Sequence, residues 1–201
     1  MIAIVDYGMG NITSARMALE HVGADVQLTD DPGTISDADG VVLPGVGAFP
    51  RAMRELERRG LAEVITEYSV TGPVLGICLG MQLLFQSSTE LGGAEGLGIL
   101  EGSVDTLDAG GLKVPQIGWN DVAWSDGAPL TDGLPERTAM YHVHSFAARP
   151  ADPSVVIGTA EYGGRFATAV AHENIYGVQF HPEKSSTHGL GLLRNFVRLA
   201  T

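Results

Sequence analysis

The sequence predicts an α/β fold with three layers, in which helices flank a mostly parallel central sheet and additional antiparallel strands extend the C-terminal half. Two observations support this prediction. In the first half, short continuous apolar runs such as "IAIV" (2–5) and "GVVL" (40–43) alternate with helical patterns, which is typical of parallel strands covered on both faces. In the second half, strand-like segments follow one another closely, which indicates antiparallel strands.

The first half supplies the expected parallel layer. A helix is predicted after the first strand and ends at Gly23, and the next strand is "DVQL" (25–28). Residues 49–71 form a helical pattern with charged residues on one side and apolar residues on the other. The apolar run "PVLGI" (73–77) follows as a buried strand and leads into a predicted helix, "LGMQLLFQ" (79–86).

The second half supplies the expected additional strands. The strand-like segments are "SVDTL", "VAW", "MYHVHSF", "VVIGTAEY", "ATAVAHE" and "YGVQFH". The stretch "ENIYG" (173–177) resembles a tight hairpin connection, and a final helix is expected from about Ser185. Because no internal repeat or long linker interrupts the pattern, residues 1–201 are interpreted as one domain.

Composition narrows the classes of partner and compartment. The 201 residues carry a net charge of −12, which disfavours binding to nucleic acid and to anionic membranes. The amino terminus, "MIAIVDYGMG", lacks the basic residues of a signal peptide, and its apolar run is too short to span a membrane. A single cysteine cannot form an internal disulfide or a cysteine-based metal site. We therefore expect a cytoplasmic protein.

That single cysteine lies in "GICLG" (76–80), between the predicted strand and helix. Gly76 and Gly80 flank Cys78 in the G-x-nucleophile-x-G arrangement, in which a sharp strand-to-helix turn exposes the nucleophile. The turn directs the helix amino terminus at the thiol, which favours the thiolate. The alternative interpretation is a small buried cysteine that only fills the core.

A base is available in "GVQFHPEKSS". His181 and Glu183 are two residues apart at the end of the predicted strand, so both side chains are expected on one face, where the carboxylate can orient the imidazole. Pro182 disfavours further strand pairing and would leave the histidine at an open sheet edge. The alternative for "FHPE" on its own is a structural histidine near a surface ion pair.

Together, "GICLGMQLLF" and "GVQFHPE" resemble the class I, triad-type glutamine amidotransferases. Five further stretches resemble the glutaminase subunits of imidazole glycerol phosphate synthases: "DYGMGN" (6–11), "LPGVGAF" (43–49), "PQIGWN" (115–120), "YHVHSF" (141–146) and "FHPEKSS" (180–186). Gln116 departs from the histidine expected in many members.

This resemblance implies hydrolysis of glutamine to glutamate, with Cys78 as nucleophile, His181 as base and Glu183 orienting it. It also implies an oxyanion hole made by Leu79 and by the segment at Gly45 and Val46, completed when a partner binds. The substrate-binding positions that it implies are Gly47, Gln82, Glu90, Ser145 and Phe146. No cofactor and no metal are implied.

The resemblance further implies a heterodimer with a separate (βα)8-barrel cyclase subunit, which uses the ammonia to make imidazole glycerol phosphate and an aminoimidazole carboxamide ribotide in histidine biosynthesis. The expected interface positions are Asn11, Trp119, Tyr141 and Lys184. His142 and His144 share a strand face, but without a third ligand they are expected to serve structural hydrogen bonding.

Two other functions remain open from the residues. One is a related triad amidotransferase with a different acceptor, or a free-standing γ-glutamyl hydrolase. The other is a binding subunit without activity, although the presence of Cys78, His181 and Glu183 together disfavours it.

Overall fold

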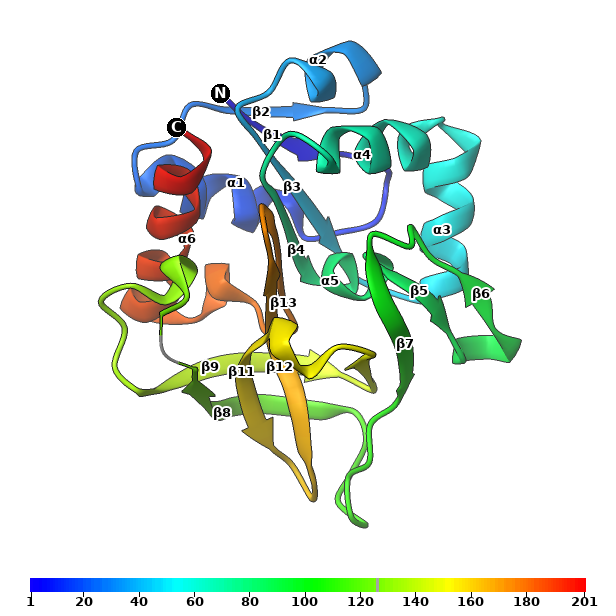
Figure 1. Cartoon of the computed structure of the whole chain (residues 1–201), viewed down its shortest axis with the longest axis vertical. Helices are drawn as coiled ribbons and strands as arrows, with labels where there is room; N and C mark the ends of the chain where they lie inside the picture. The colour runs from blue at the N-terminus through cyan, green and yellow to red at the C-terminus, as the bar shows by residue number, and fades with distance from the viewer. Residues whose placement is uncertain (126) are drawn as a thin grey trace.

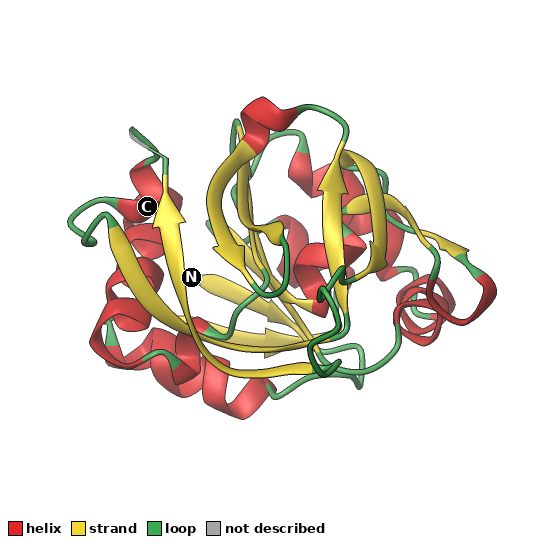
Figure 2. Ribbon diagram, turned by 90° about the horizontal axis from the view of Figure 1, so that it is seen from below, coloured by secondary structure: helices red, strands yellow, loops and turns green. Residues whose placement is uncertain are grey.

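The computed structural model describes residues 1–125 and 127–201. Its centre is a parallel sheet in the order β2-β1-β3-β4-β13, with helices on both faces (Figures 1 and 2). The parallel strands are β1 (Ile2–Val5), β2 (Val26–Thr29), β3 (Gly40–Gly45), β4 (Val74–Cys78) and β13 (Ile175–Val178). The helices are α1 (Ile12–His21), α2 (Pro32–Ser36), α3 (Phe49–Arg58), α4 (Leu61–Ser69), α5 (Leu79–Leu83) and α6 (Ser186–Ala200).

Alternation along the strands divides the core into two layers. In β1, Ile2 and Ile4 pack with Leu19 of α1 and with Phe196 of α6. The intervening Ala3 and Val5 point to the opposite face, where α3 and α4 contribute Leu56 and Ile65. Both faces of the parallel sheet are therefore buried, which explains why its strands are continuous apolar runs.

The sheet continues beyond β13 in the order β13-β12-β10-β7-β5-β6, and β11, β8 and β9 branch from β12. These strands are β5 (Phe85–Ser88), β6 (Ala94–Glu95), β7 (Leu100–Thr106), β8 (Gln116–Trp124), β9 (Arg137–His144), β10 (Phe146–Pro150), β11 (Val156–Glu161) and β12 (Arg165–His172). Most of the added pairs are antiparallel, β5 with β7 being parallel. This sheet order confirms the predicted fold class. The predicted hairpin at "ENIYG" is also confirmed, because β12 pairs directly with β13.

Two predicted helices differ in length. The pattern over 49–71 is divided into α3 and α4, because Gly60 adopts a left-handed conformation with φ of 69° and ends the first helix. The helix after Cys78 stops at Leu83, and Phe85 already begins β5. The short helix α2 was not predicted.

The setting of His181 also differs from the prediction. Strand β13 ends at Val178, three residues before His181. This strand lies between β4 and β12 instead of at a sheet edge. Residues Pro182–Lys184 form a 3-10 turn. Among the described residues, no helix combines the length and apolar character needed to cross a membrane.

Candidate active site

Cys78 occupies a strained turn between β4 and α5. Its φ of 56° and ψ of −112° are unusual for a residue with a side chain. The flanking glycines permit close packing: a Cβ on Gly76 would lie 2.7 Å from the backbone of Met81, and one on Gly80 would collide with the carbonyl oxygen of Leu43. The predicted turn is therefore present, and its strain is typical of functional sites.

His181 and Glu183 lie beside this turn. His181 Nδ1 and Glu183 Oε1 are 2.8 Å apart, and the two side chains are only 5% and 3% exposed. The 3-10 turn brings them together, instead of the shared strand face that was predicted. Burial lowers the pKa of the imidazole, but hydrogen bonds to Cys78 and Glu183 and the negative charge on both outweigh it and raise the pKa to about 9. A histidine so placed holds its proton near neutral pH and can deliver it to a leaving group.

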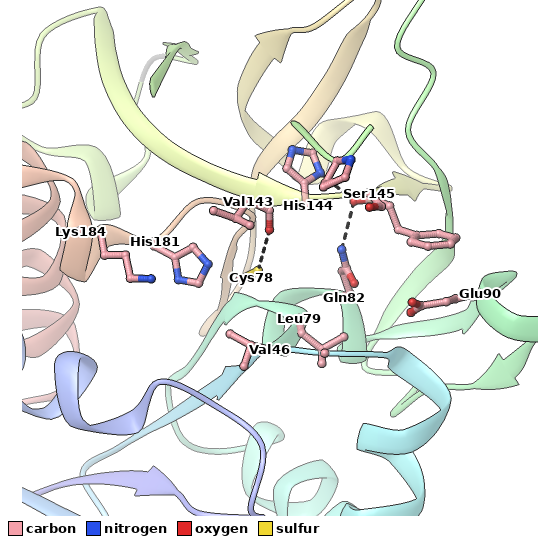
Figure 3. Close-up of a pocket in the computed structure, with 13 residues that line it drawn as sticks. Val46, Cys78, Leu79, Gln82, Glu90, Val143, His144, Ser145, His181 and Lys184 are labelled. Atoms are coloured by element: carbon pink, nitrogen blue, oxygen red, sulfur yellow. Dashed lines mark hydrogen bonds between the residues drawn. The ribbon is translucent and has the colours of Figure 1, made fainter. Parts of the chain in front are cut away.

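The thiol of Cys78 opens onto a cavity of about 340 Å³ (Figure 3). Val143 and Ser145 lie on one side of it, and Val46 and Leu79 lie on the other. The lining residues are Val46, Gly47, Cys78, Leu79, Gln82, Glu90, Pro115, Val143, His144, Ser145, Phe146, His181 and Lys184. The structure thus gathers most of the predicted site residues from distant parts of the sequence.

A second, small cavity of about 10 Å³ adjoins the histidine. Asn11, Gly45 and Val46 line it together with His181 and Glu183. The second carboxylate oxygen of Glu183, Oε2, is buried and has no hydrogen-bond partner among the described residues. Asn11, predicted at the partner interface, therefore lies close to the histidine and carboxylate.

The segment around Val46 lines the large cavity through Val46 and Gly47. Gly45 pairs with Cys78 where β3 and β4 end, and Gly47 has a φ of 113° that favours glycine. Val46 between them is 42% exposed. On its buried side, Tyr7 Oη donates a hydrogen bond of 2.9 Å to Pro44 O.

Two predicted substrate-binding side chains have defined partners. Glu90 Oε2 accepts a hydrogen bond of 2.7 Å from the Phe49 N–H, at the start of α3. Gln82 Nε2 donates to Phe146 O at 3.1 Å and to Gln179 Oε1 at 3.0 Å. Because both amide hydrogens of Gln82 are used, its side chain can meet a ligand only through Oε1, as an acceptor.

Three of the predicted interface residues lie on one strand pair or next to it. Trp119 of β8 is 56% exposed and stands edge-on to Tyr141 of β9, with ring centroids 6.0 Å apart. Ile117, two residues before Trp119, is 61% exposed. Lys184 lines the large cavity. Exposed large apolar side chains beside a site are typical of a surface that binds another molecule.

The two histidines of β9 are engaged by protein groups. His142 Nδ1 donates to Met140 O at 3.0 Å, and its Nε2 lies 2.7 Å from Thr168 Oγ1. Burial and the neighbouring His144 lower the pKa of His142 to about 3, so its ring is neutral. His144 Nδ1 donates to Phe146 O at 2.8 Å.

Gln116 contacts the second of these histidines. His144 Nε2 lies 2.9 Å from the Gln116 side-chain amide. Burial lowers the pKa of His144 to about 4. These contacts match the structural hydrogen bonding predicted for both histidines. Gln116 contacts His144, which lines the large cavity, but Gln116 is not itself a lining residue. Within residues 1–125 and 127–201, no three His, Cys, Asp or Glu side chains gather as a metal site would require.

Comparison with known proteins assigns the family. The model of the family described as "Glutamine amidotransferase class-I" matches residues 3–200. The chain belongs to this family. The predicted glutamine amidotransferase activity is thereby confirmed, while the roles of individual residues remain predictions.

Curated relatives in this family include proteins named imidazole glycerol phosphate synthase subunit HisH. The one from Moorella thermoacetica is 51% identical over 98% of this chain and 94% of its own length. The one from Aromatoleum aromaticum is 46% identical over 99% and 98%. The predicted resemblance to these subunits is confirmed.

Solved structures agree on the fold. A structure titled as a glutamine amidotransferase covers 100% of this chain and 99% of its own, with a TM-score of 0.78 and 20% identity. A putative GMP synthase subunit from Thermoplasma acidophilum covers 99% and 92%, with a TM-score of 0.76 and 21% identity.

Several residues at the site were not predicted from the sequence. Pro115, Val143 and His144 line the large cavity, and the buried Gln179 contacts Cys78. Gln179 precedes His181 by two residues, so a single amide within the otherwise apolar run "YGVQF" was an available signal.

Proposed function

We propose that this chain is the glutaminase subunit of an imidazole glycerol phosphate synthase. It hydrolyses glutamine and passes ammonia to a cyclase subunit, which forms imidazole glycerol phosphate and an aminoimidazole carboxamide ribotide. The observation that supports this most strongly is the identity of up to 51% to subunits of that name over nearly the full length. The cavity that joins Cys78 to His181 supports the glutaminase half of the reaction.

In the first half of the reaction, Cys78 Sγ attacks the carboxamide carbon of glutamine and its proton resides on His181. The tetrahedral intermediate collapses as His181 returns that proton to the departing nitrogen, which leaves as ammonia and a thioester remains. His181 then takes a proton from water, the hydroxide attacks the thioester, and glutamate leaves as the proton returns to the thiolate. Glu183, 2.8 Å from the imidazole, keeps the ring oriented throughout.

The oxyanion of each tetrahedral intermediate needs backbone donors. The Leu79 N–H directly follows the nucleophile, and Val46, which follows Gly45 at the end of β3, lines the same cavity. The glycines around Val46 allow this peptide to turn. We propose that partner binding turns it into the active orientation.

Substrate glutamine would lie along the cavity wall. Glu90 supplies a negative charge for the α-ammonium group, and Gln82 Oε1 can accept a hydrogen bond. The backbone around Gly47, Ser145 and Phe146 provides further polar groups on the same cavity. A carboxylate facing an ammonium group gives selectivity for an amino acid over a simple amide.

The partner surface is proposed to include Asn11, Trp119, Tyr141 and Lys184, and the partner to be a (βα)8-barrel cyclase in a heterodimer. The exposed Trp119 and the position of Lys184 at the cavity support this surface. The cytoplasmic location expected from the sequence stays a prediction.

The deciding experiment measures glutamate released from glutamine by the chain alone, and then with the cyclase subunit and its ribonucleotide substrate. The Cys78→Ala variant is the blank. We expect strong activation that is absent in the blank. Equal activity without the cyclase would instead indicate a free-standing hydrolase or another acceptor, and no activity in any mixture would favour a binding subunit.

A further inference from the structure

A buried chain of amide hydrogen bonds ends on the sulfur of Cys78. Gln179 Nε2 donates to Cys78 Sγ at 3.8 Å. Gln82 Nε2 in turn donates to Gln179 Oε1 at 3.0 Å and to Phe146 O at 3.1 Å. Gln179 is 0% exposed and Gln82 is 5% exposed, and the bonds from Gln82 to Gln179 and from Gln179 to Cys78 are buried, which strengthens them.

The direction of this chain is determined by Phe146. A backbone carbonyl can only accept, so the group of Gln82 that faces Phe146 O must be the NH₂. The second hydrogen of that NH₂ requires an acceptor, which is Gln179 Oε1. The NH₂ of Gln179 is therefore the end that faces Cys78, because turning this amide the other way would place its NH₂ against the NH₂ of Gln82, two donors with no acceptor between them.

The sulfur also has an acceptor beside it. Cys78 Sγ lies 3.7 Å from Val143 O, to which the thiol proton can be donated. Once the proton has moved to His181, the Val143 carbonyl dipole and the thiolate repel each other. The Gln179 N–H then becomes a charge-assisted donor to the thiolate, and hydrogen bonds of this kind are stronger than neutral ones.

We propose that Gln179 is a further catalytic residue, whose amide donates a hydrogen bond to the Cys78 thiolate and is held in that orientation by Gln82. This inference rests on the proposed function in one respect, that Cys78 is the nucleophile. Gln179 is then a third group that contacts the sulfur, beside His181 and the Val143 carbonyl. It also connects the cavity wall to the nucleophile, because Phe146 and Gln82 both line the cavity.

The test follows the alkylation rate of Cys78 by iodoacetamide against pH in the full chain. Cys78 is the only cysteine, so the signal reports one site. In Gln179→Leu and Gln179→Met, we expect the pH midpoint of alkylation to rise by about one to two units and kcat/KM for glutamine to fall by roughly 10- to 100-fold. The second variant decides the outcome if the first does not fold.

Thr168→Val is the matched control. Thr168 is also 0% exposed, and the change removes a buried hydrogen bond to His142 that is not part of the chain from Gln82 through Gln179 to Cys78. It should lower stability without moving the alkylation midpoint. A purely structural role for Gln179 predicts the same behaviour in its own variants, so an unchanged midpoint in folded Gln179→Leu or Gln179→Met overturns the proposal.

Gln82→Leu tests the orienting step. The pH midpoint of Cys78 alkylation should rise in this variant as well. In the Gln179→Leu background, adding Gln82→Leu should not raise the midpoint further, because Gln82 acts through Gln179. Additive shifts would overturn this step. The proposed function fails on a different result, namely glutaminase activity that persists in Cys78→Ala.

Discussion

At the scale of single residues, the turn at Cys78 depends on Gly76 and Gly80, where an added Cβ would meet backbone atoms of Met81 and Leu43. The glycines of "GICLG" report close backbone contacts on both sides of Cys78, and those contacts are present. The contacts of the thiol itself were not predictable. Gln179 and Val143 reach the sulfur across 101 and 65 residues of sequence, and such contacts depend on strand register, which spacing does not reveal.

Gly80→Ala is expected to prevent the turn from forming. The new Cβ would overlap the carbonyl oxygen of Leu43, a backbone atom that cannot move aside. We predict a loss of about 3 kcal/mol or more in the free energy of unfolding, measured by urea denaturation. Gly191→Ala in α6 is the control, since its Cβ meets only the Leu134 side chain at 3.4 Å. The free energy of unfolding of Gly191→Ala should stay within about 1 kcal/mol of the wild-type value. Equal losses of unfolding free energy in both variants would contradict the prediction.

His181 should make stability depend on pH. Its folded-state pKa of about 9 lies above the ordinary value of 6.5, so the folded chain binds this proton more tightly than the unfolded chain. The stabilisation is therefore complete below pH 6.5 and is lost as the pH rises through about 9. The free energy of unfolding of wild type should fall over this window by more than that of His181→Gln. Parallel declines would show that His181 is not the group responsible.

At the scale of elements, the prediction succeeded where one pattern covered a whole strand and failed at the ends of helices. Helical periodicity over 49–71 continues through Gly60, so it did not reveal that this glycine would adopt the left-handed conformation. Likewise, Phe85 suits the apolar side of a helix and of a strand equally. Its pairing with Leu100 in β7 decides for the strand, and that partner is distant in sequence.

Helix α3 shows how an element and the site depend on each other. Its N-cap residue, Ala48, offers no side-chain acceptor, and Glu90, which begins a short 3-10 helix 41 residues from Phe49, accepts from the Phe49 N–H instead. Glu90→Ala should therefore cost about 1 kcal/mol in unfolding free energy and also raise KM for glutamine.

Glu90→Gln separates these two roles. It keeps an acceptor for the Phe49 N–H but removes the charge proposed for the substrate ammonium group. We expect most of the stability to return while KM stays high, as measured by thermal unfolding and steady-state kinetics. A KM that recovers together with stability would mean that Glu90 acts only as a cap.

At the scale of the whole molecule, the site forms because strands distant in sequence end together. Strands β3, β4 and β13 are neighbours in the parallel sheet, and their carboxyl ends lead to Val46, Cys78 and His181. Ligand sites in open α/β sheets lie beyond these carboxyl ends. The β9–β10 segment forms the opposite wall (Figure 3). The parallel order was predictable from sequence, whereas this wall was not, since nothing in "YHVHSF" shows that the strand breaks at Ser145.

The exposed ring of Trp119 gives a direct test of the partner surface. The chain has two tryptophans, and Trp124 is partly buried, with Nε1 donating to Thr138 Oγ1 at 2.9 Å. If the cyclase subunit covers Trp119, burial of the 56% exposed ring should shift its fluorescence emission to shorter wavelength. In a titration with a tryptophan-free cyclase, Trp119→Phe should abolish the shift, and Trp124→Phe should retain it. A shift that persists in Trp119→Phe would place the partner on another face, because Trp124 would then be the residue whose surroundings change.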